Sequence, residues 1–298
     1  MKNILIIGCG LIGSSVLRAI VANKITKKIF VYEKSKKNIL KIKKLKLPCY
    51  LINDFKKTVP NADLIIFCTP LNEYENIILK INKYLLPKTI ITDVGSSKEK
   101  SSVVIKKTLK KGISWTSSHP ITGSEVSGPE HGKKDLFLHK WCILIKDKNT
   151  NKKHLIVLSK FWKKIGSKVS IMSSKKHDVV FSMTSHLPHL IAYNLIKTAT
   201  DFEKQQRYKL IKFSAGGLRD FSRIAASNEI MWRDIFFNNQ NNISKAIDLF
   251  IKNLREFKND IQSKNNKSII KKLIETKQVR KKIIKLKQDI NKPDFGRK

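Results

Sequence analysis

A glycine-rich turn between a short apolar run and a helical pattern restricts the fold of this chain more than any other feature. Residues 3–7 read Asn-Ile-Leu-Ile-Ile, the turn Gly-Cys-Gly-Leu-Ile-Gly occupies 8–13, and residues 14–22 have a helical pattern. A continuous apolar run of this length is typical of a buried parallel strand. The spacing GxGxxG between a strand and a helix therefore predicts a Rossmann-type βαβ unit that binds a dinucleotide.

Each glycine of this turn has its own task. Gly8 allows the tight turn, Gly10 lets a pyrophosphate approach the backbone, and Gly13 lets the helix pack closely on the strand. The amides and the partial positive charge of the helix N-terminus suit phosphates. We therefore expect the cofactor to bind at Gly8, Gly10, Leu11, Ile12 and Gly13.

An acidic residue at the end of the second apolar run bears on the choice of cofactor. Residues 28–32 predict a strand, and Glu33 follows it, about twenty residues past the glycines. A carboxylate at this place binds the adenosine ribose hydroxyls and repels a 2′-phosphate, so it favours NAD over NADP. The neighbouring lysines leave NADP open; they are Lys34, Lys36 and Lys37.

Further strand patterns continue the alternation of a doubly wound α/β domain. Ligands of such domains bind at the carboxyl ends of the strands, so Thr69 and Pro70, which end the pattern over 62–70, should border the cofactor. We expect this dinucleotide-binding domain to span 1–172. Its other predicted elements are strands at 89–93, 113–117, 141–145 and 169–171 and a helix at 151–165.

A histidine follows the predicted strand at 113–117. His119 precedes a proline and two glycines, with hydroxyls and one carboxylate around it. This pattern fits a turn with a surface histidine or the base of a dehydrogenase, and its place after a nucleotide-binding sheet favours the base. Two serines follow the strand at 89–93. There Ser96 or Ser97 fits an active-site hydroxyl and a helix N-cap equally well.

Helical patterns replace the strand patterns after residue 172 and continue to about residue 289. Residues 173–200 predict a long helix that Pro188 kinks or interrupts. Arg219 and Arg223 are four residues apart, share a helix face, and together suit a dicarboxylate substrate. The alternative is that these arginines form structural salt bridges with neighbouring acidic side chains, those of Asp220, Glu229 or Asp234.

The size of the net charge by itself suggests a nucleic-acid or anionic-surface partner, but the distribution of the charge argues against one. The formal net charge is +38 at pH 7, and the excess is mostly lysine spread along the whole length. Nucleic-acid modules concentrate charge on one face, often with arginines and stacking aromatic rings. The lysine-rich helix predicted at 268–287 fits a solvated outer face. A positive field would still attract an anionic substrate.

Composition also excludes several other classes. No apolar run reaches the length of about 20 residues that spans a bilayer. The four cysteines form no CxxC pair, so they predict neither a disulfide framework nor a metal site. They fit reduced core residues of a cytoplasmic protein. The length of 298 residues is enough for two domains with their own cores.

In its motifs the chain resembles the prephenate/arogenate dehydrogenases of tyrosine biosynthesis. The resemblance rests on GCGLIGSS at 8–15, ADLIIFCTP at 62–70, TDVGSSK at 92–98, HPITGSEVSG at 119–128, HDVVFSMTSHLPH at 177–189 and GGLRDFSRIAASNEIMWRDIF at 216–236. It implies an α/β fold with an N-terminal Rossmann-type domain, followed over 173–298 by an all-helical domain for substrate and dimerisation. It also implies a homodimer formed through the helical domain.

The resemblance assigns roles to the matching positions. It implies that His119 accepts the proton of the substrate's ring hydroxyl and that Ser96 hydrogen-bonds this hydroxyl or the histidine. Arg223 would hold a substrate carboxylate, and His189 would lie near the nicotinamide and the substrate. The further substrate-binding candidates are Ser124, Glu125, Ser185 and Arg219. Ser97 stands where valine is usual in the family, and Ser124 where threonine is common.

The implied function is the NAD-dependent oxidative decarboxylation of prephenate to 4-hydroxyphenylpyruvate and CO2. Arogenate carries an amine where prephenate has a ketone, and Glu125 would pair with that ammonium. An arogenate dehydrogenase, or a dual cyclohexadienyl dehydrogenase, is therefore the alternative. A basic nucleic-acid-binding protein on a Rossmann scaffold is the remote alternative from another class.

Overall fold

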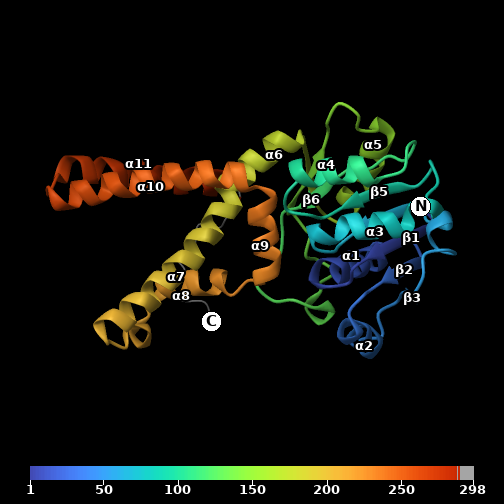
Figure 1. The fold of residues 1–298 in the computed structure, drawn as a ribbon, viewed down its shortest axis with the longest axis horizontal. Coiled ribbons are helices and arrows are strands. Elements are labelled where there is room, and N and C mark those ends of the chain that lie inside the picture. Colours follow the sequence, from blue (N-terminus) through green and yellow to red (C-terminus); the bar gives the residue numbers. More distant parts are fainter. Residues whose placement is uncertain (287, 289–298) are drawn as a thin grey trace.

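Five parallel strands form the central sheet of the first half, in the order β3-β2-β1-β4-β5 (Figure 1). The computed structural model describes residues 1–286 and residue 288. The strands are β1 (Asn3–Ile7), β2 (Lys28–Tyr32), β3 (Tyr50–Ile52), β4 (Leu64–Phe67) and β5 (Ile90–Asp93). This order, with β1 in the middle, confirms the predicted Rossmann-type α/β fold.

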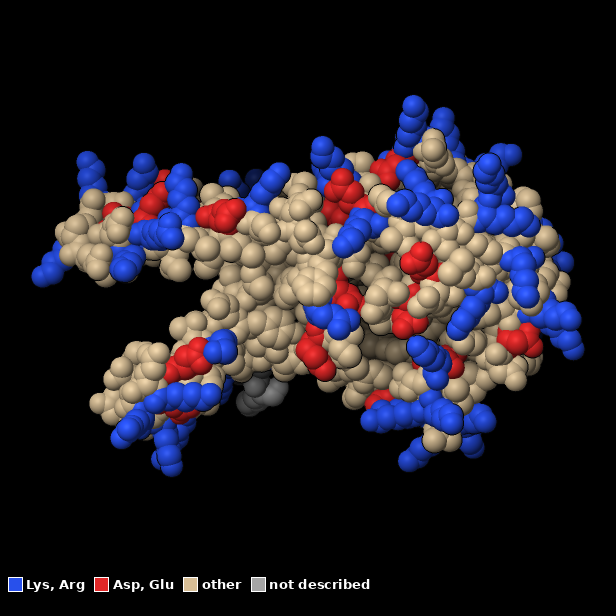
Figure 2. Space-filling view, viewed as in Figure 1, with Lys and Arg blue, Asp and Glu red and all other residues tan. Residues whose placement is uncertain are grey.

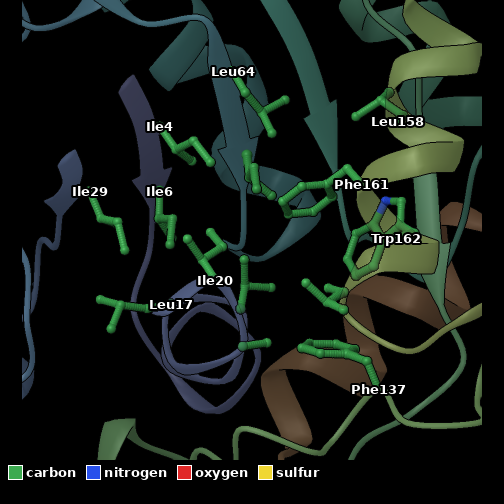
Figure 3. Packing of buried hydrophobic residues seen from close by; sticks show 14 of the residues in the cluster. Ile4, Ile6, Leu17, Ile20, Ile29, Leu64, Phe137, Leu158, Phe161 and Trp162 are labelled. Carbon is green, nitrogen blue, oxygen red and sulfur yellow. The ribbon is translucent and has the colours of Figure 1, made fainter. Parts of the chain in front are cut away.

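Helices cover both faces of this sheet because β1 is apolar on both. Successive side chains of a strand point to opposite faces, so Ile4 and Ile6 join one buried cluster while Leu5 and Ile7 join the other. Figure 3 shows the first cluster, in which Trp162 lies beside the sheet. The covering helices are α1 (Leu11–Ala22), α2 (Lys36–Lys44), α3 (Tyr74–Ile81), α4 (Glu99–Thr108) and α5 (Lys152–Lys164).

A second sheet corrects one prediction. Its order is β6-β7-β8, with β6 (Ser118–Pro120) antiparallel to β7 (Trp141–Ile145), and β7 parallel to β8 (Lys168–Met172). The strand expected at 113–117 is wrong: that segment makes only a bridge from Trp115 to Ile91 of β5. Pairing with β7 determines which residues form the strand. His119 therefore lies within β6 and not on a loop after a strand.

The second half is helical, and Figure 1 shows two arms that diverge from the nucleotide-binding half. The helices α10 and α11 form one arm, and α7 with α8 forms the other. The expected interruption near Pro188 is a π-helical turn over Ser182–His186. The helices are α6 (Ser174–Phe181), α7 (Leu187–Gln206), α8 (Gly216–Ala225), α9 (Glu229–Asn238), α10 (Gln240–Gln262) and α11 (Asn266–Lys285). The last residue of the predicted C-terminal helix, Lys287, lies outside the described residues.

The arms keep much apolar surface in contact with solvent. Neither α8 nor the described α11 contains a buried residue, and α10 buries only Ile243 and Ala246. Large apolar side chains are exposed along both arms, including Leu195, Phe202, Phe213, Leu249, Leu254, Ile261, Leu273 and Ile274. Exposed apolar surface of this extent is unusual on a folded chain and is typical of interaction sites.

Charges are dispersed on the molecular surface. On the face drawn in Figure 2, lysines and arginines are scattered around the nucleotide-binding half and along the outer sides of the arms. The notch between the arms carries mostly neutral side chains. None of the described helices combines the length and apolarity that crossing a membrane requires. All four cysteines are free, and Cys9 and Cys142 are buried.

Candidate functional site

The glycine-rich turn has the geometry of a phosphate-binding loop. Gly8 has a φ of +88°, a conformation that side chains rarely adopt. A Cβ on Gly13 would lie 2.1 Å from the Gly8 carbonyl oxygen, whereas a Cβ on Gly10 would meet nothing within 4 Å. Gly10 is also the N-cap of α1 and offers no side-chain cap. The loop therefore packs tightly on its inner side and leaves open space and the helix amides, including those of Leu11 and Ile12, on its outer side.

The neighbouring strand ends supply the other predicted cofactor residues. The Glu33 carboxylate accepts hydrogen bonds from the amide of Cys9 at 2.8 Å and from the amide of Ser35 at 2.9 Å. It is thus held beside the glycine turn. Thr69 follows β4, and its buried hydroxyl has no hydrogen-bond partner among the described residues. Its methyl group would be 2.8 Å from a Cβ on Gly8, and Pro70 follows it as the last residue before a 3-10 turn.

A buried chain of hydrogen bonds begins at His119. Its Nδ1 lies 2.8 Å from Nε2 of His177, whose Nδ1 lies 2.7 Å from Oδ1 of Asp178. His119 comes from β6, while His177 and Asp178 come from α6. His177 and Asp178 are inaccessible to solvent and His119 is 8% exposed. The first strand of the second sheet is thereby tied to the first helix of the helical half.

The Asp178 carboxylate also organises the loop between β5 and α4. It accepts hydrogen bonds from the amides of Lys98 and Glu99, each at 2.8 Å, and from the Ser97 hydroxyl at 3.2 Å. The cap of α4 is therefore a carboxylate from α6, and neither serine is the N-cap that one alternative expected. Lys98 is fully buried, and its ammonium contacts Asp93 at 2.5 Å and the Ser118 carbonyl at 2.7 Å.

Two further histidines extend the cluster into the helical half. Asn239 donates from its amide nitrogen to His186 Nδ1 at 3.1 Å and to the Asp178 carbonyl at 2.8 Å. The buried Nε2 of His186 has no hydrogen-bond partner among the described residues. His189 donates from Nδ1 to the Ser185 carbonyl at 2.9 Å and stacks on Trp232 with a centroid distance of 3.8 Å.

Burial keeps these histidines neutral. It lowers the pKa of His119 well below the usual value, and the neighbouring His177, Lys98 and His186 lower it further. Burial likewise lowers the pKa of His177 and His189, and it lowers the pKa of His186 to about 4. Burial alone would raise the pKa of Asp178, but hydrogen bonds from His177 and the Glu99 amide leave it lowered. The cluster thus combines neutral imidazoles with an ionised carboxylate near neutral pH.

The structure does not bring every predicted substrate residue to this cluster. Arg219 and Arg223 lie on α8, which packs on α7, and Arg223 faces Asp220 at 3.7 Å, as the salt-bridge alternative expected. Ser124 donates to the Glu125 carboxylate at 3.0 Å in the loop after β6. His189 and Ser185 do lie close to the cluster, and Ser96 adjoins it, since its backbone is near enough to influence the His186 ring.

Sequence reasoning missed several members of this cluster, namely Lys98, His177, Asp178, His186 and Asn239. The available signal was the dipeptide His177-Asp178 inside a quoted motif and a lysine directly after two strand-end serines. Neither pattern reveals a partner in the other half of the chain. Among the described residues, no group of three or more His, Cys, Asp or Glu side chains is arranged to hold a metal ion.

Comparisons with known proteins match both halves of the chain. A family model described as the nucleotide-binding domain of prephenate dehydrogenase matches residues 16–171, and one described as its dimerisation domain matches residues 173–276. Cyclohexadienyl dehydrogenase of Zymomonas mobilis is 33% identical over 94% of this chain and 95% of its own length. Prephenate dehydrogenase of Bacillus subtilis is 30% identical over 90% of this chain and 72% of its own.

A solved structure is similar over nearly the whole fold. Prephenate dehydrogenase of Aquifex aeolicus, crystallised with hydroxyphenyl propionate and NAD+, superposes with a TM-score of 0.87. It is 33% identical, and the similarity covers 95% of this chain and 98% of that one.

Proposed function

The chain belongs to the prephenate dehydrogenase family, and from that premise we propose that it converts prephenate to 4-hydroxyphenylpyruvate and CO2 with NAD as oxidant. The observation that carries this proposal is His119, a buried neutral histidine in a family motif. A neutral imidazole is the state that a general base requires.

The glycine turn and its neighbours fit a dinucleotide. The open side of Gly10 and the uncapped amides of α1 suit the pyrophosphate, and the unpartnered Thr69 hydroxyl suits a polar ligand. Each Glu33 oxygen accepts one amide hydrogen bond and keeps a lone pair for a ribose hydroxyl, which favours NAD over NADP. When bound, the nicotinamide supplies a hydride acceptor for the ring carbon that carries the hydroxyl.

His119 would act at that hydroxyl. The O–H bond breaks and its proton moves to the imidazole, while the C–H bond is lost as hydride and the ring carbon becomes a carbonyl. The ring carboxylate then leaves as CO2, and its bonding electrons complete an aromatic ring while the carbonyl becomes a phenolate oxygen. That oxygen takes the proton back from the imidazolium and becomes the phenol of the product. Ser96 would hydrogen-bond the hydroxyl or the histidine. The chain mainly orients the reactants and supplies the base.

The remaining predicted residues would hold the two carboxylates of the substrate. Arg223 would bind one of them, because a guanidinium matches a carboxylate in charge and geometry. Arg219 and His189 are candidates for the second. Ser124, Glu125 and Ser185 would line the same pocket. The Asp220 contact of Arg223, at 3.7 Å with both side chains partly exposed, is weak enough to yield to a substrate.

Arogenate is the second candidate substrate. The similarity to a cyclohexadienyl dehydrogenase favours activity on both compounds. Glu125 would pair with the ammonium of arogenate.

We further propose a division of labour near residue 172, with dinucleotide binding in 1–172 and substrate binding and dimerisation in 173–298. Only seven apolar residues of the described helical half are buried within a single chain, and many others are exposed on the two arms. This exposed apolar surface supports a homodimer. Free cysteines fit a cytoplasmic location. Size-exclusion chromatography with light scattering tests the dimer, and an active monomer at micromolar concentration would reject it.

The substrate assignment is tested by kcat/KM for NADH formation from prephenate and from arogenate. The proposal expects a higher value with prephenate, and a higher value with arogenate would replace it with the second candidate. His119→Asn should lower kcat by about 10²–10⁴-fold, the usual contribution of a general base. Full turnover in that variant would remove His119 from the mechanism.

A further inference from the structure

The hydrogen-bonded chain His119–His177–Asp178 crosses between the two halves of the molecule. The proposed reaction uses His119 but gives no task to His177 or Asp178. Both are inaccessible to solvent, and burying a carboxylate is costly unless its oxygens are hydrogen-bonded. The distances along the chain, 2.8 Å and 2.7 Å, are those of well-formed hydrogen bonds.

The positions of the hydrogens in the series His119–His177–Asp178 can be assigned by starting from Asp178. Asp178 Oδ1 accepts from the Lys98 amide and contacts His177 Nδ1, while Oδ2 accepts from the Ser97 hydroxyl and the Glu99 amide. A carboxylate that faces this many donors is ionised and acts only as an acceptor. His177 Nδ1 must therefore carry a hydrogen and donate it to Asp178.

One tautomer of each ring then follows. Burial lowers the pKa of His177, so the ring is neutral and its Nε2 has a lone pair instead of a hydrogen. That lone pair accepts from His119 Nδ1, which must carry the hydrogen of the neutral His119 ring. The free lone pair of His119 is consequently on Nε2.

The neighbouring Lys98 and His186 side chains do not compete for the hydrogen bond between His119 and His177. The Lys98 ammonium is bound by the Asp93 carboxylate and the Ser118 carbonyl. His186 Nδ1 accepts from the Asn239 amide. Both groups lie close enough to act on His119 electrostatically, yet their hydrogen bonds go to Asp93, Ser118 and Asn239. His177 Nε2 is thus left to His119 Nδ1.

We propose that His177 and Asp178 are positioning residues that hold His119 in the tautomer whose Nε2 accepts the substrate's hydroxyl proton. The inference rests on the proposed function and extends it from the base to the pair that orients it. During the transfer the proton moves from the hydroxyl oxygen to Nε2, and the Nδ1 hydrogen stays on His119. The positive charge that forms on the ring is stabilised by the acceptor and the carboxylate behind it.

The tautomer is measured directly, without substrate. Histidine-selective ¹⁵N labelling and long-range proton–nitrogen NMR distinguish the two neutral forms of each of the seven histidines. The signals that disappear in His119→Asn identify residue 119. We expect the hydrogen on Nδ1 in the wild type and a mixture of tautomers in Asp178→Asn. A wild-type His119 with its hydrogen on Nε2 overturns the inference.

Kinetics test the consequence for turnover. His177→Leu and Asp178→Asn should each lower kcat by about 10- to 100-fold, the usual effect of removing a hydrogen-bond partner that orients a functional side chain. The KM for prephenate should change by less than about twofold, since neither residue binds substrate. His177→Gln offers an oxygen to His119 Nδ1 and should recover part of the loss. Lys175→Gln, on the exposed side of α6, is the matched control and should keep the wild-type kcat.

Thermal melting of each variant separates this role from folding. Asp178 also caps α4, so Asp178→Asn can lose stability. His177→Leu leaves that cap in place, and its kinetics decide the question if Asp178→Asn unfolds. A folded His177→Leu with wild-type kcat, or one with a raised KM alone, overturns the inference. A wild type inactive on both prephenate and arogenate would instead overturn the proposed function, and the NMR result would then stand by itself.

Discussion

One methyl group at Gly13 should destabilise the nucleotide-binding half, because α1 passes the end of β1 too closely for a side chain. A Cβ there would lie 2.1 Å from the Gly8 carbonyl oxygen and 3.3 Å from Cβ of Cys68. The nearest contact is with backbone, which cannot rotate away as a flexible side chain would. In Gly13→Ala the helix must therefore move away from the strand.

The expected loss combines two opposing effects. Overpacking costs about 1–3 kcal/mol, and a clash with fixed backbone places Gly13→Ala near the upper end. Alanine is better than glycine within a helix by about 1 kcal/mol, which offsets part of this cost. The net loss of about 2 kcal/mol should lower Tm by about 4–8 °C for a domain of this size.

Gly10→Ala is the matched control within the same turn. A Cβ at Gly10 meets nothing within 4 Å, so its Tm should stay within about 2 °C of the wild type. The methyl group would instead occupy the approach of the pyrophosphate and weaken NAD binding by about tenfold or more. Circular dichroism melting and calorimetric NAD titration measure the two effects. A Gly10→Ala variant that melts as low as Gly13→Ala, or that binds NAD like the wild type, would refute the reasoning.

Three further predictions concern pH, cofactor and substrate. Burial lowers the pKa of His186 to about 4, and the unfolded chain binds that proton near pH 6.5. The free energy of unfolding should therefore be constant above about pH 6.5 and fall as the pH drops from about 6.5 to 4, by about 3 kcal/mol for His186 alone. Urea denaturation at several pH values measures this, and a free energy independent of pH would contradict it. Glu33→Ala should reduce the preference for NAD over NADP in kcat/KM, and an unchanged preference would reject the ribose contact. Arg223→Ala should raise KM for prephenate by about tenfold or more, while Lys281→Ala on exposed α11 should not; equal effects would show that α11 belongs to the site.

Local patterns were enough to predict four of the five strands of the first sheet, because its central strands are apolar on both faces. The predicted ranges of β1 and β2 agree with the structure, as does that of β7 in the second sheet. The strand expected at 113–117 was wrong because Ser118–Pro120 lacks an apolar pattern and becomes a strand only through pairing with β7. The three-residue strand β3 is too short to produce a period of its own.

The candidate site was likewise only partly predictable from the sequence. His119 and the glycine turn could be predicted because each stands in a contiguous motif. The partners of His119 could not, since His177 lies 58 residues away and approaches it only when α6 packs beside α4 and β6. The capping of α4 by Asp178 is equally non-local, and it replaced the serine cap that the adjacent sequence suggested.

The central claim is that this chain couples hydride transfer to the loss of CO2 from prephenate. The most direct measurement is the amount of CO2 released and of NADH formed by the purified protein from the same prephenate solution. The account predicts equal molar amounts, with both lost together in His119→Asn. NADH formation without CO2, or no NADH from prephenate with NAD, would contradict it.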